Sequence, residues 1–340
     1  MTRTAAAILV TLLSIPLTVH AQDNAPKPVR NGAAVDGDEI LILRHQKLQK
    51  GSHDEFYRLS REGVWPWFEK IGTRVVGQWK VFHPDGGGSD EYDEGWRLAR
   101  YASYDHWVAT RTDELGGNGP DYLKNRKALA TRGELLLGSD GAYFLQGNMA
   151  PGGPYFLPGL AESYEPSGDA SAKVEDISLD PGPQGTVADP ESLTPIPVRN
   201  DVAQPGSEIV TMRYWKIDKG RYDDFYRASV EGVWPYFEKI GARVIGQWQV
   251  IHPPRDTRDE SPDYDEVILM TRYASHAHWA ATRNPAQLGG NGPDYDKMRE
   301  ALALRRSLTH ETTLTFLEGY MYDSPPKFMP GLQESYRAVE

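Results

Sequence analysis

The chain has 340 residues, of which 37 are Lys or Arg and 48 are Asp or Glu, so its formal net charge is −11. This acidic balance argues against binding to nucleic acid or to an anionic membrane surface. The sequence contains no cysteine, which excludes disulfides, thiolate nucleophiles and Cys-ligated metal centres. Hydrophobic residues make up 39% of the chain and charged residues 25%, proportions that are typical of a globular protein.

The amino-terminal segment, residues 1–21, is predicted to be a secretory signal peptide. Arg3 precedes an apolar stretch, Ala5 to Val19, that is too short for a stable membrane span, and small residues occupy the two cleavage positions before residue 22. We therefore expect cleavage after Ala21, export to the periplasm or the medium, and no stable membrane insertion of the mature chain. An uncleaved amino-terminal anchor is the alternative. Residues 22–37 are predicted to form a disordered lead.

The rest of the sequence is a tandem repeat. Residues 39–84 align without a gap on residues 208–253, and about 29 of the 46 positions are identical. We expect a first repeat at residues 38–165 and a second at residues 207–340, each of a size that can fold alone. Between them, residues 166–206 are rich in Pro, Gly, Ser and Asp, the composition of a flexible acidic linker.

The periodicity of apolar residues predicts the elements of each repeat. In the first repeat they are, in chain order, a strand from Glu39 to Lys47, a helix from Ser52 to Ile71, strands from Arg74 to His83 and from Glu94 to Tyr101, helices from Tyr104 to Thr110 and from Pro120 to about Leu136, and a strand from Ala142 to Leu145. Pro66 is expected to kink the first helix. The order β-α-β-β-α-β is the ferredoxin-like unit, an α+β fold whose antiparallel sheet leaves one face in need of a partner. Two copies in one chain supply that partner.

Short motifs in each repeat resemble a known family. In the first repeat they are Lys50-Gly51-x-x-Asp54-x-Phe56, Glu62-Gly63-x-x-Pro66-x-x-Glu69-Lys70-x-Gly72, Val76-Gly77-x-Trp79 and Arg100-Tyr101, and the second repeat contains them again from Lys219 to Trp248 and at Arg272-Tyr273. This pattern resembles the NIPSNAP family of dimeric α/β-barrel proteins. The resemblance implies that the two ferredoxin-like units pack sheet against sheet around a lumen, here within one chain. Relatives in the same superfamily include haem-dependent enzymes, cofactor-free monooxygenases, isomerases and members with no known activity, so the resemblance implies a fold without naming a reaction.

Because the duplication makes the dimer of single-copy relatives unnecessary, we expect a monomer with an internal pseudo-dimer.

Recurring arginine and glutamine residues are the candidate ligand-binding residues. They are Arg44, Arg74, Gln78 and Arg100, which recur as Arg213, Arg243, Gln247 and Arg272. Arginines retained on an acidic protein indicate a pocket for a carboxylate or another anion, because guanidinium groups bind such groups bidentately. The alternative is that each arginine pairs with a repeated acid such as Glu62, Glu69 or Asp93.

The alternation of side chains divides the first strand into two faces. Ile40, Ile42 and Arg44 share one face, and Leu41 and Leu43 share the other, which we expect to pack beneath the helices.

Two histidines are the candidate catalytic residues. His83 and His252 stand at matching strand ends, and proline follows each. Such a histidine could act as a general base, or as a haem or metal ligand near the lumen mouth. The alternative is a hydrogen-bonded structural histidine, because no second histidine or carboxylate lies at ligand spacing nearby. We expect no metal site, and haem is an alternative that the sequence does not favour.

These patterns together predict a protein that binds a small anionic or aromatic organic ligand in the barrel lumen. One alternative is a cofactor-free or haem-dependent oxidoreductase or monooxygenase that uses His83 or His252. A second alternative is a structural or interaction module whose lumen is filled by its own side chains.

Overall fold

The computed structural model describes residues 38–111, 119–139, 141–147, 173–179, 208–283 and 293–321. The predicted signal peptide, the predicted lead and most of the predicted linker lie outside these residues. None of the described helices is long and apolar enough to cross a membrane.

Both repeats contain the predicted β-α-β-β-α-β order. The elements of the first repeat are β1 (Ile40–Gln49), α1 (His53–Leu59), α2 (Trp65–Lys70), β2 (Arg74–Phe82), β3 (Tyr92–Tyr101), α3 (Tyr104–Ala109), α4 (Pro120–Glu134), β4 (Leu136–Gly138) and β5 (Ala142–Gln146). Those of the second repeat are β6 (Ile209–Asp218), α5 (Tyr222–Ala228), α6 (Trp234–Lys239), β7 (Arg243–Ile251), β8 (Tyr264–Tyr273), α7 (His276–Ala281), α8 (Pro293–Ser307) and β9 (Thr309–Met321).

The first predicted helix is interrupted in both repeats. A π-helical turn, Ser60–Val64, separates α1 from α2, and Ser229–Val233 separates α5 from α6 in the same way. Pro66 lies in the first turn of α2. A proline has no N–H to donate to the preceding turn, and a widened π turn is one way in which a helix accommodates such a gap. Where the sequence predicted a kink, the helix thus contains a π turn immediately before Pro66.

Eight strands close into one antiparallel barrel. Around the barrel the order is β1-β3-β2-β9-β6-β8-β7-β5, and β5 pairs with β1 to complete the circle. The two repeats are joined where β2 pairs with β9 and where β5 pairs with β7. Because neighbouring strands all run in opposite directions, matching strand ends of the two repeats lie at the same end of the barrel. The predicted internal pseudo-dimer is therefore confirmed.

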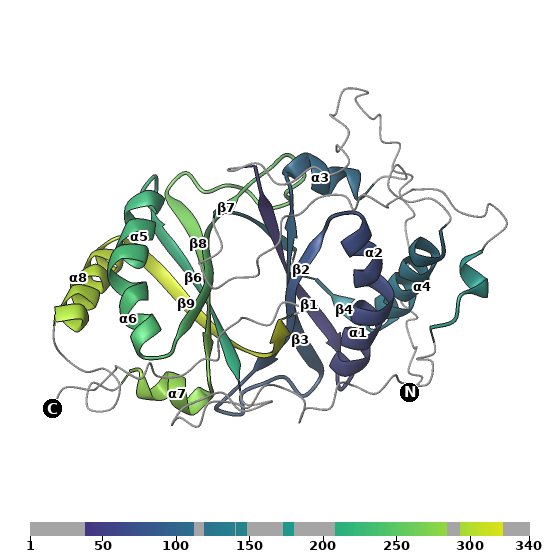
Figure 1. Ribbon diagram of the computed structural model, residues 1–340, viewed down its shortest axis with the longest axis horizontal. Helices are drawn as coiled ribbons and strands as arrows, with labels where there is room; N and C mark the ends of the chain where they lie inside the picture. Colours follow the sequence, from purple (N-terminus) through teal and green to yellow (C-terminus); the bar gives the residue numbers. More distant parts are fainter. Residues whose placement is uncertain are drawn as a thin grey trace, which may run out of the picture.

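Helices cover the outer face of each half of the barrel. Figure 1 shows α1, α2 and α4 on one side of the strands and α5, α6 and α8 on the other. Ile40 and Ile42 of β1 pack outward in a cluster with Trp65 of α2, whereas Leu41 and Leu43 belong to the cluster in the barrel interior. The expectation that Leu41 and Leu43 pack beneath the helices was wrong. Both faces of β1 are buried, so alternation alone identifies two faces but not which one meets the helices.

A short part of the predicted linker packs against the first repeat. Residues 173–179 contain one 3-10 turn, Val174–Asp176. The Lys127 ammonium on α4 donates to the backbone carbonyl of Ile177, and the Arg58 guanidinium on α1 donates to that of Leu179 at 3.2 Å. This piece of the linker is thus held by backbone hydrogen bonds at the outer helix layer.

Candidate functional site

The middle of the barrel is occupied by the protein's own side chains. Buried apolar residues of both repeats form one cluster there, namely Leu41, Leu43, Val76, Trp79, Leu98, Leu145, Val210, Met212, Ile245, Trp248, Val250, Ile268, Met270 and Leu317. The predicted ligand site in the lumen therefore has to be sought away from this centre. Two larger cavities lined by described residues lie away from it, one on the outer face of the sheet and one at an end of the barrel.

The first cavity, of about 440 Å³, lies between the outer face of the first sheet and helices α2 and α4. We call it the arginine pocket. Its lining includes Arg44, Gln46, Arg97, Tyr122, Asn125 and Arg132. Arg44 on β1 lies directly opposite Arg97 on β3, and directly opposed residues of an antiparallel pair share one face of the sheet. Helix α4 adds Arg132 from above that face, so three guanidinium groups come together.

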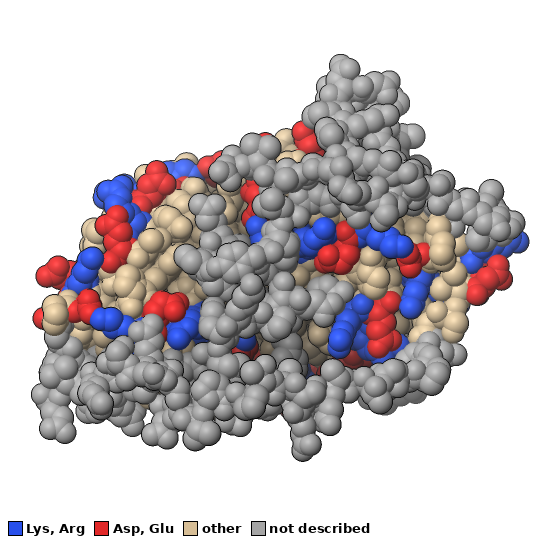
Figure 2. Space-filling view, viewed as in Figure 1, with Lys and Arg blue, Asp and Glu red and all other residues tan. Residues whose placement is uncertain are grey.

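These three arginines have no carboxylate partner among the described residues. Arg97 is 3% exposed and Arg132 9% exposed. The Arg132 guanidinium donates to the Ser60 hydroxyl at 2.9 Å and lies 4.7 Å from the centre of the Phe56 ring. On the face drawn in Figure 2, by contrast, Lys and Arg are interspersed with Asp and Glu. Surface cations there have acidic neighbours, whereas the buried arginines of the pocket do not.

The electrostatic cost of this arrangement is visible in the pKa values. Burial, with a smaller contribution from the charge of Arg44, lowers the pKa of Arg97 to about 10 and that of Arg132 to about 9. Burial also lowers the pKa of Arg44, together with the charge of Arg111 at the pocket edge. Since the values for Arg97 and Arg132 lie above neutral pH, both groups remain charged there. The pocket is therefore a partly desolvated cluster of positive charge.

Four of the other predicted binding residues are held by nearby carboxylates. Arg74 lies 3.2 Å from Glu69 and Arg100 lies 2.5 Å from Glu39. Their counterparts behave alike, because Arg243 lies 3.2 Å from Glu238 and Arg272 pairs with Glu208. The structure thus shows for these four arginines the ion pairs that the sequence left open as an alternative, although Glu39 and Glu208 were not among the acids considered.

The two predicted glutamines lie in the sheet rather than in a cavity. Gln78 and Gln247 are fully buried, and neither side-chain amide has a hydrogen-bond partner among the described residues. Gln78 lies opposite Arg97 in the β2–β3 pairing, and Gln247 lies opposite Leu269 in the β7–β8 pairing. Gln78 therefore shares its sheet face with the arginine pocket without lining it.

The second repeat fills the equivalent space with apolar side chains. Gln46, Arg97 and Asn125 of the first repeat correspond to Trp215, Leu269 and Met298, which pack together in the core of the second repeat. The guanidinium of Arg305, the counterpart of Arg132, lies 4.7 Å from the centre of the Trp215 ring. Arg213, the counterpart of Arg44, lies 5.9 Å from the same ring. Cation–π contacts with Trp215 replace an open cavity there.

The second cavity, of about 550 Å³, lies at the end of the barrel where β2 ends. We call it the mouth pocket, and its lining includes His45, His83, Asp85, Glu94, Trp96 and Tyr143. Of the two predicted catalytic histidines, His83 lines this cavity. His252 is engaged on both ring nitrogens, with Nδ1 at 3.1 Å from Asp256 and Nε2 at 3.4 Å from Glu266. His252 therefore does not fit the role of an axial haem ligand.

Two buried arginines of the arginine pocket, Arg97 and Arg132, were not among the predicted site residues. Arg97 was passed over because the selection relied on recurrence, and Leu269 stands at its place in the second repeat. Arg132 does recur, as Arg305, but it lies on a helix and the selection considered strands. The sequence signal for Arg97 was a charged residue on a strand at a position that is apolar in the other repeat. Within the described ranges, no three His, Asp or Glu residues are arranged to hold a metal ion.

No protein-family model matches the sequence, and no curated protein matches it. Solved structures do match. A candidate monooxygenase from Lactobacillus acidophilus NCFM is 8% identical, with a TM-score of 0.46, over 87% of this chain and 100% of the other. A mutant chlorite dismutase from Candidatus Nitrospira defluvii is 10% identical, with a TM-score of 0.37, over 83% and 92%.

The matched structures also include the family whose motifs the sequence resembles. An uncharacterized NIPSNAP domain protein from Burkholderia xenovorans is 18% identical, with a TM-score of 0.24, over 32% of this chain and 91% of the other. That share of the chain is about the length of one repeat. With TM-scores below 0.5 these are likenesses only, and the strand pairings of the chain itself establish its fold, in which two ferredoxin-like repeats close into one α/β barrel.

Proposed function

We propose that this protein binds a small anionic organic molecule in the arginine pocket of the first repeat. The observation that carries the proposal is the convergence of Arg44, Arg97 and Arg132 in a cavity, without a carboxylate partner among the described residues. A buried charge without a counter-charge is costly. An anion that enters the pocket supplies that counter-charge and can accept bidentate hydrogen bonds from the guanidinium groups.

The rest of the lining indicates the kind of anion. Trp67, Phe68 and Tyr122 give the pocket aromatic walls, and the Trp67 and Tyr122 ring centres lie 5.2 Å apart. The side-chain oxygens of Gln46 and Asn125 are buried and have no hydrogen-bond partner among the described residues. Ligand pockets typically have about 300–1,000 Å³ of space with a few placed polar groups. An aromatic or partly apolar carboxylate with a hydrogen-bond donor matches this chemistry best.

The proposal predicts that Arg97→Leu weakens the binding of an aromatic carboxylate by at least about tenfold, because hydrogen bonds to charged groups contribute about 1.5–3 kcal/mol. Leucine already occupies the equivalent position in the second repeat as Leu269, so the fold should tolerate it. Isothermal titration calorimetry with benzoate measures the affinity. Benzamide, a neutral molecule of similar shape, serves as the ligand control and is expected to bind more weakly than benzoate to the wild type.

Two outcomes would contradict the proposal. The first is a wild-type protein that binds benzoate no better than benzamide. The second is an Arg97→Leu variant that keeps the wild-type affinity for benzoate. Arg305→Leu is the matched control variant, because it removes a buried arginine of the second repeat, beside Trp215. It is expected to leave benzoate binding unchanged.

A further inference from the structure

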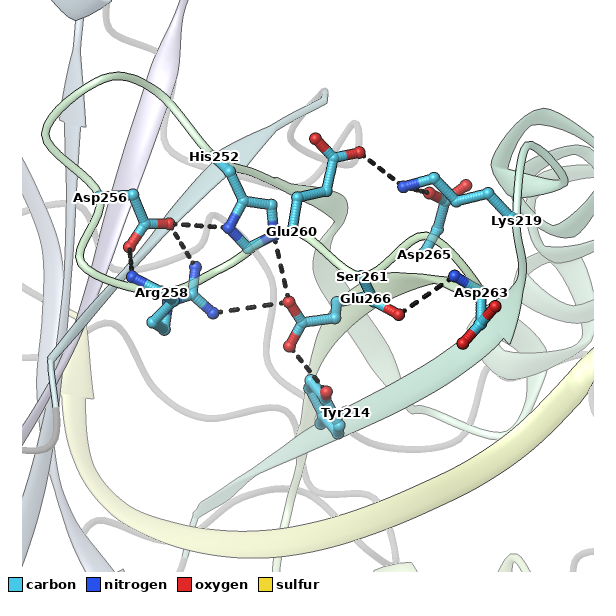
Figure 3. Close-up of polar contacts among 10 residues, drawn as sticks. All are labelled: Tyr214, Lys219, His252, Asp256, Arg258, Glu260, Ser261, Asp263, Asp265 and Glu266. Atoms are coloured by element: carbon cyan, nitrogen blue, oxygen red, sulfur yellow. Dashed lines mark hydrogen bonds and ion pairs between the residues drawn. The ribbon is translucent and has the colours of Figure 1, made fainter.

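The mouth pocket differs from the equivalent region of the second repeat. In the second repeat, Glu266 accepts a hydrogen bond from the Tyr214 hydroxyl at 2.7 Å and lies 3.6 Å from the Arg258 guanidinium. Arg258 also lies 2.9 Å from Asp256. Figure 3 shows the Arg258 guanidinium between the carboxylates of Asp256 and Glu266. The same guanidinium lies 4.2 Å from the centre of the Tyr143 ring. The second repeat thus brings its own cation to this end of the barrel.

The corresponding loop of the first repeat, between β2 and β3, contains no lysine or arginine. It covers residues 83–91, whereas the loop between β7 and β8 covers residues 252–263 and is three residues longer. The longer loop carries Arg258, and the shorter one has Gly86, Gly87 and Gly88 instead. The space beside the shorter loop is the mouth pocket.

Glu94 is the counterpart of Glu266, and its charge is not matched by Lys or Arg. Its carboxylate lies 3.1 Å from Nε2 of His45 and 3.9 Å from Nε2 of His83. No ion pair joins it to a lysine or arginine of the part of the chain that the structure describes. Among the described residues, the lining of the pocket thus contains two carboxylates, Glu94 and Asp85, and no lysine or arginine.

Aromatic walls complete the pocket. The Trp96 ring centre lies 4.6 Å from that of His45 and 6.1 Å from that of Tyr143. Carboxylates combined with aromatic faces are the usual environment for an organic cation, since the ring faces attract positive charge. Arg258 itself shows this environment, between two carboxylates and over the ring of Tyr143.

We propose that the mouth pocket binds the guanidinium or primary ammonium group of a small organic molecule. This group contacts a carboxylate and aromatic rings there, as Arg258 does in the second repeat. The cation would lie against the Glu94 carboxylate and next to the Trp96 ring. This site is independent of the arginine pocket. His45 and Trp96 face the barrel interior, whereas Arg44 and Arg97 face the helices on the other side of the same two strands.

Three probes with the same alkyl chain test the proposal on the full chain. Butylguanidine, butylamine and 1-butanol differ in the head group, so calorimetric titration separates a guanidinium site from an ammonium site and both from simple apolar binding. We expect at least one of the two cations to bind about tenfold or more tightly than 1-butanol, and Glu94→Gln to remove that preference. Glu91→Gln is the control, because it changes the net charge by the same amount at an exposed position of the loop between β2 and β3.

A second variant keeps the test independent of any folding defect in Glu94→Gln. Gly87 lines the pocket, and a Cβ added there meets no atom within 4 Å. Gly87→Arg supplies an internal guanidinium, as the second repeat does, and is expected to lower the affinity for the cations about tenfold or more. Gly87→Ala is expected to bind as the wild type does. A wild type without preference for either cation, or unchanged affinity in both Glu94→Gln and Gly87→Arg, would overturn the proposal.

Discussion

Replacing Trp79 by alanine is expected to lower the free energy of unfolding by about 3–5 kcal/mol, because it removes a large side chain from a packed core. Trp79 is fully buried in the barrel interior. A Cβ added at Gly77 would come within 2.5 Å of the Trp79 ring. Gly319 on β9 is the pairing partner of Trp79. The ring thus fills a space bordered by two glycines, which have no side chains with which to close the cavity after truncation. Trp248 and Gly246 repeat this arrangement in the second repeat.

Urea denaturation followed by circular dichroism measures this effect. Leu137→Ala is the control, because Leu137 is 58% exposed and exposed substitutions usually change stability by less than about 0.5 kcal/mol. Trp79→Phe should cost less than Trp79→Ala, since it keeps most of the ring volume. It also removes an indole N–H that has no hydrogen-bond partner among the described residues. A loss below about 1 kcal/mol for Trp79→Ala would show that this ring is not part of the stabilising core.

The fold could be predicted from the sequence because the same pattern of apolar residues occurs in both repeats. Two copies of one period pattern predicted the element order of each repeat, and the resemblance implied how the two copies pack. Which face of β1 meets the helices could not be predicted. Leu41 and Ile42 are both fully buried, one in the barrel and one under the helices. An alternating strand indicates its buried face only when the other face meets water.

The candidate site was predictable only in part, since recurrence identifies what both repeats need rather than what one of them does. Arg100 and Arg272 recur because each pairs with an acid at the start of its repeat, Glu39 or Glu208. Arg44 was identified for the same reason, yet its partner Arg97 is absent from the second copy. The proposed functional difference between the repeats therefore depends on positions where their sequences differ.

The sequence differences between the repeats allow a second prediction, in which the second repeat gains a benzoate-binding site. We expect that the triple substitution Trp215→Gln, Leu269→Arg and Met298→Asn will give the second repeat an arginine pocket of its own. These three residues pack in the core of the second repeat, where the first repeat has an open cavity lined by Gln46, Arg97 and Asn125. The guanidinium groups of Arg213 and Arg305 already lie next to the Trp215 ring. Benzoate stoichiometry should therefore rise from one to two per chain.

Calorimetry in two backgrounds separates this result from indirect effects. In the Arg97→Leu background, where the first site is lost, the triple variant should restore benzoate binding at one per chain. Circular dichroism verifies the fold, because burying a new arginine and removing Trp215 both cost stability. A folded triple variant that binds benzoate only at the first site would mean that these three positions do not decide between an open and a filled pocket. Restored binding would show that the two repeats share one ligand-binding architecture, and that three apolar side chains have closed it in the second.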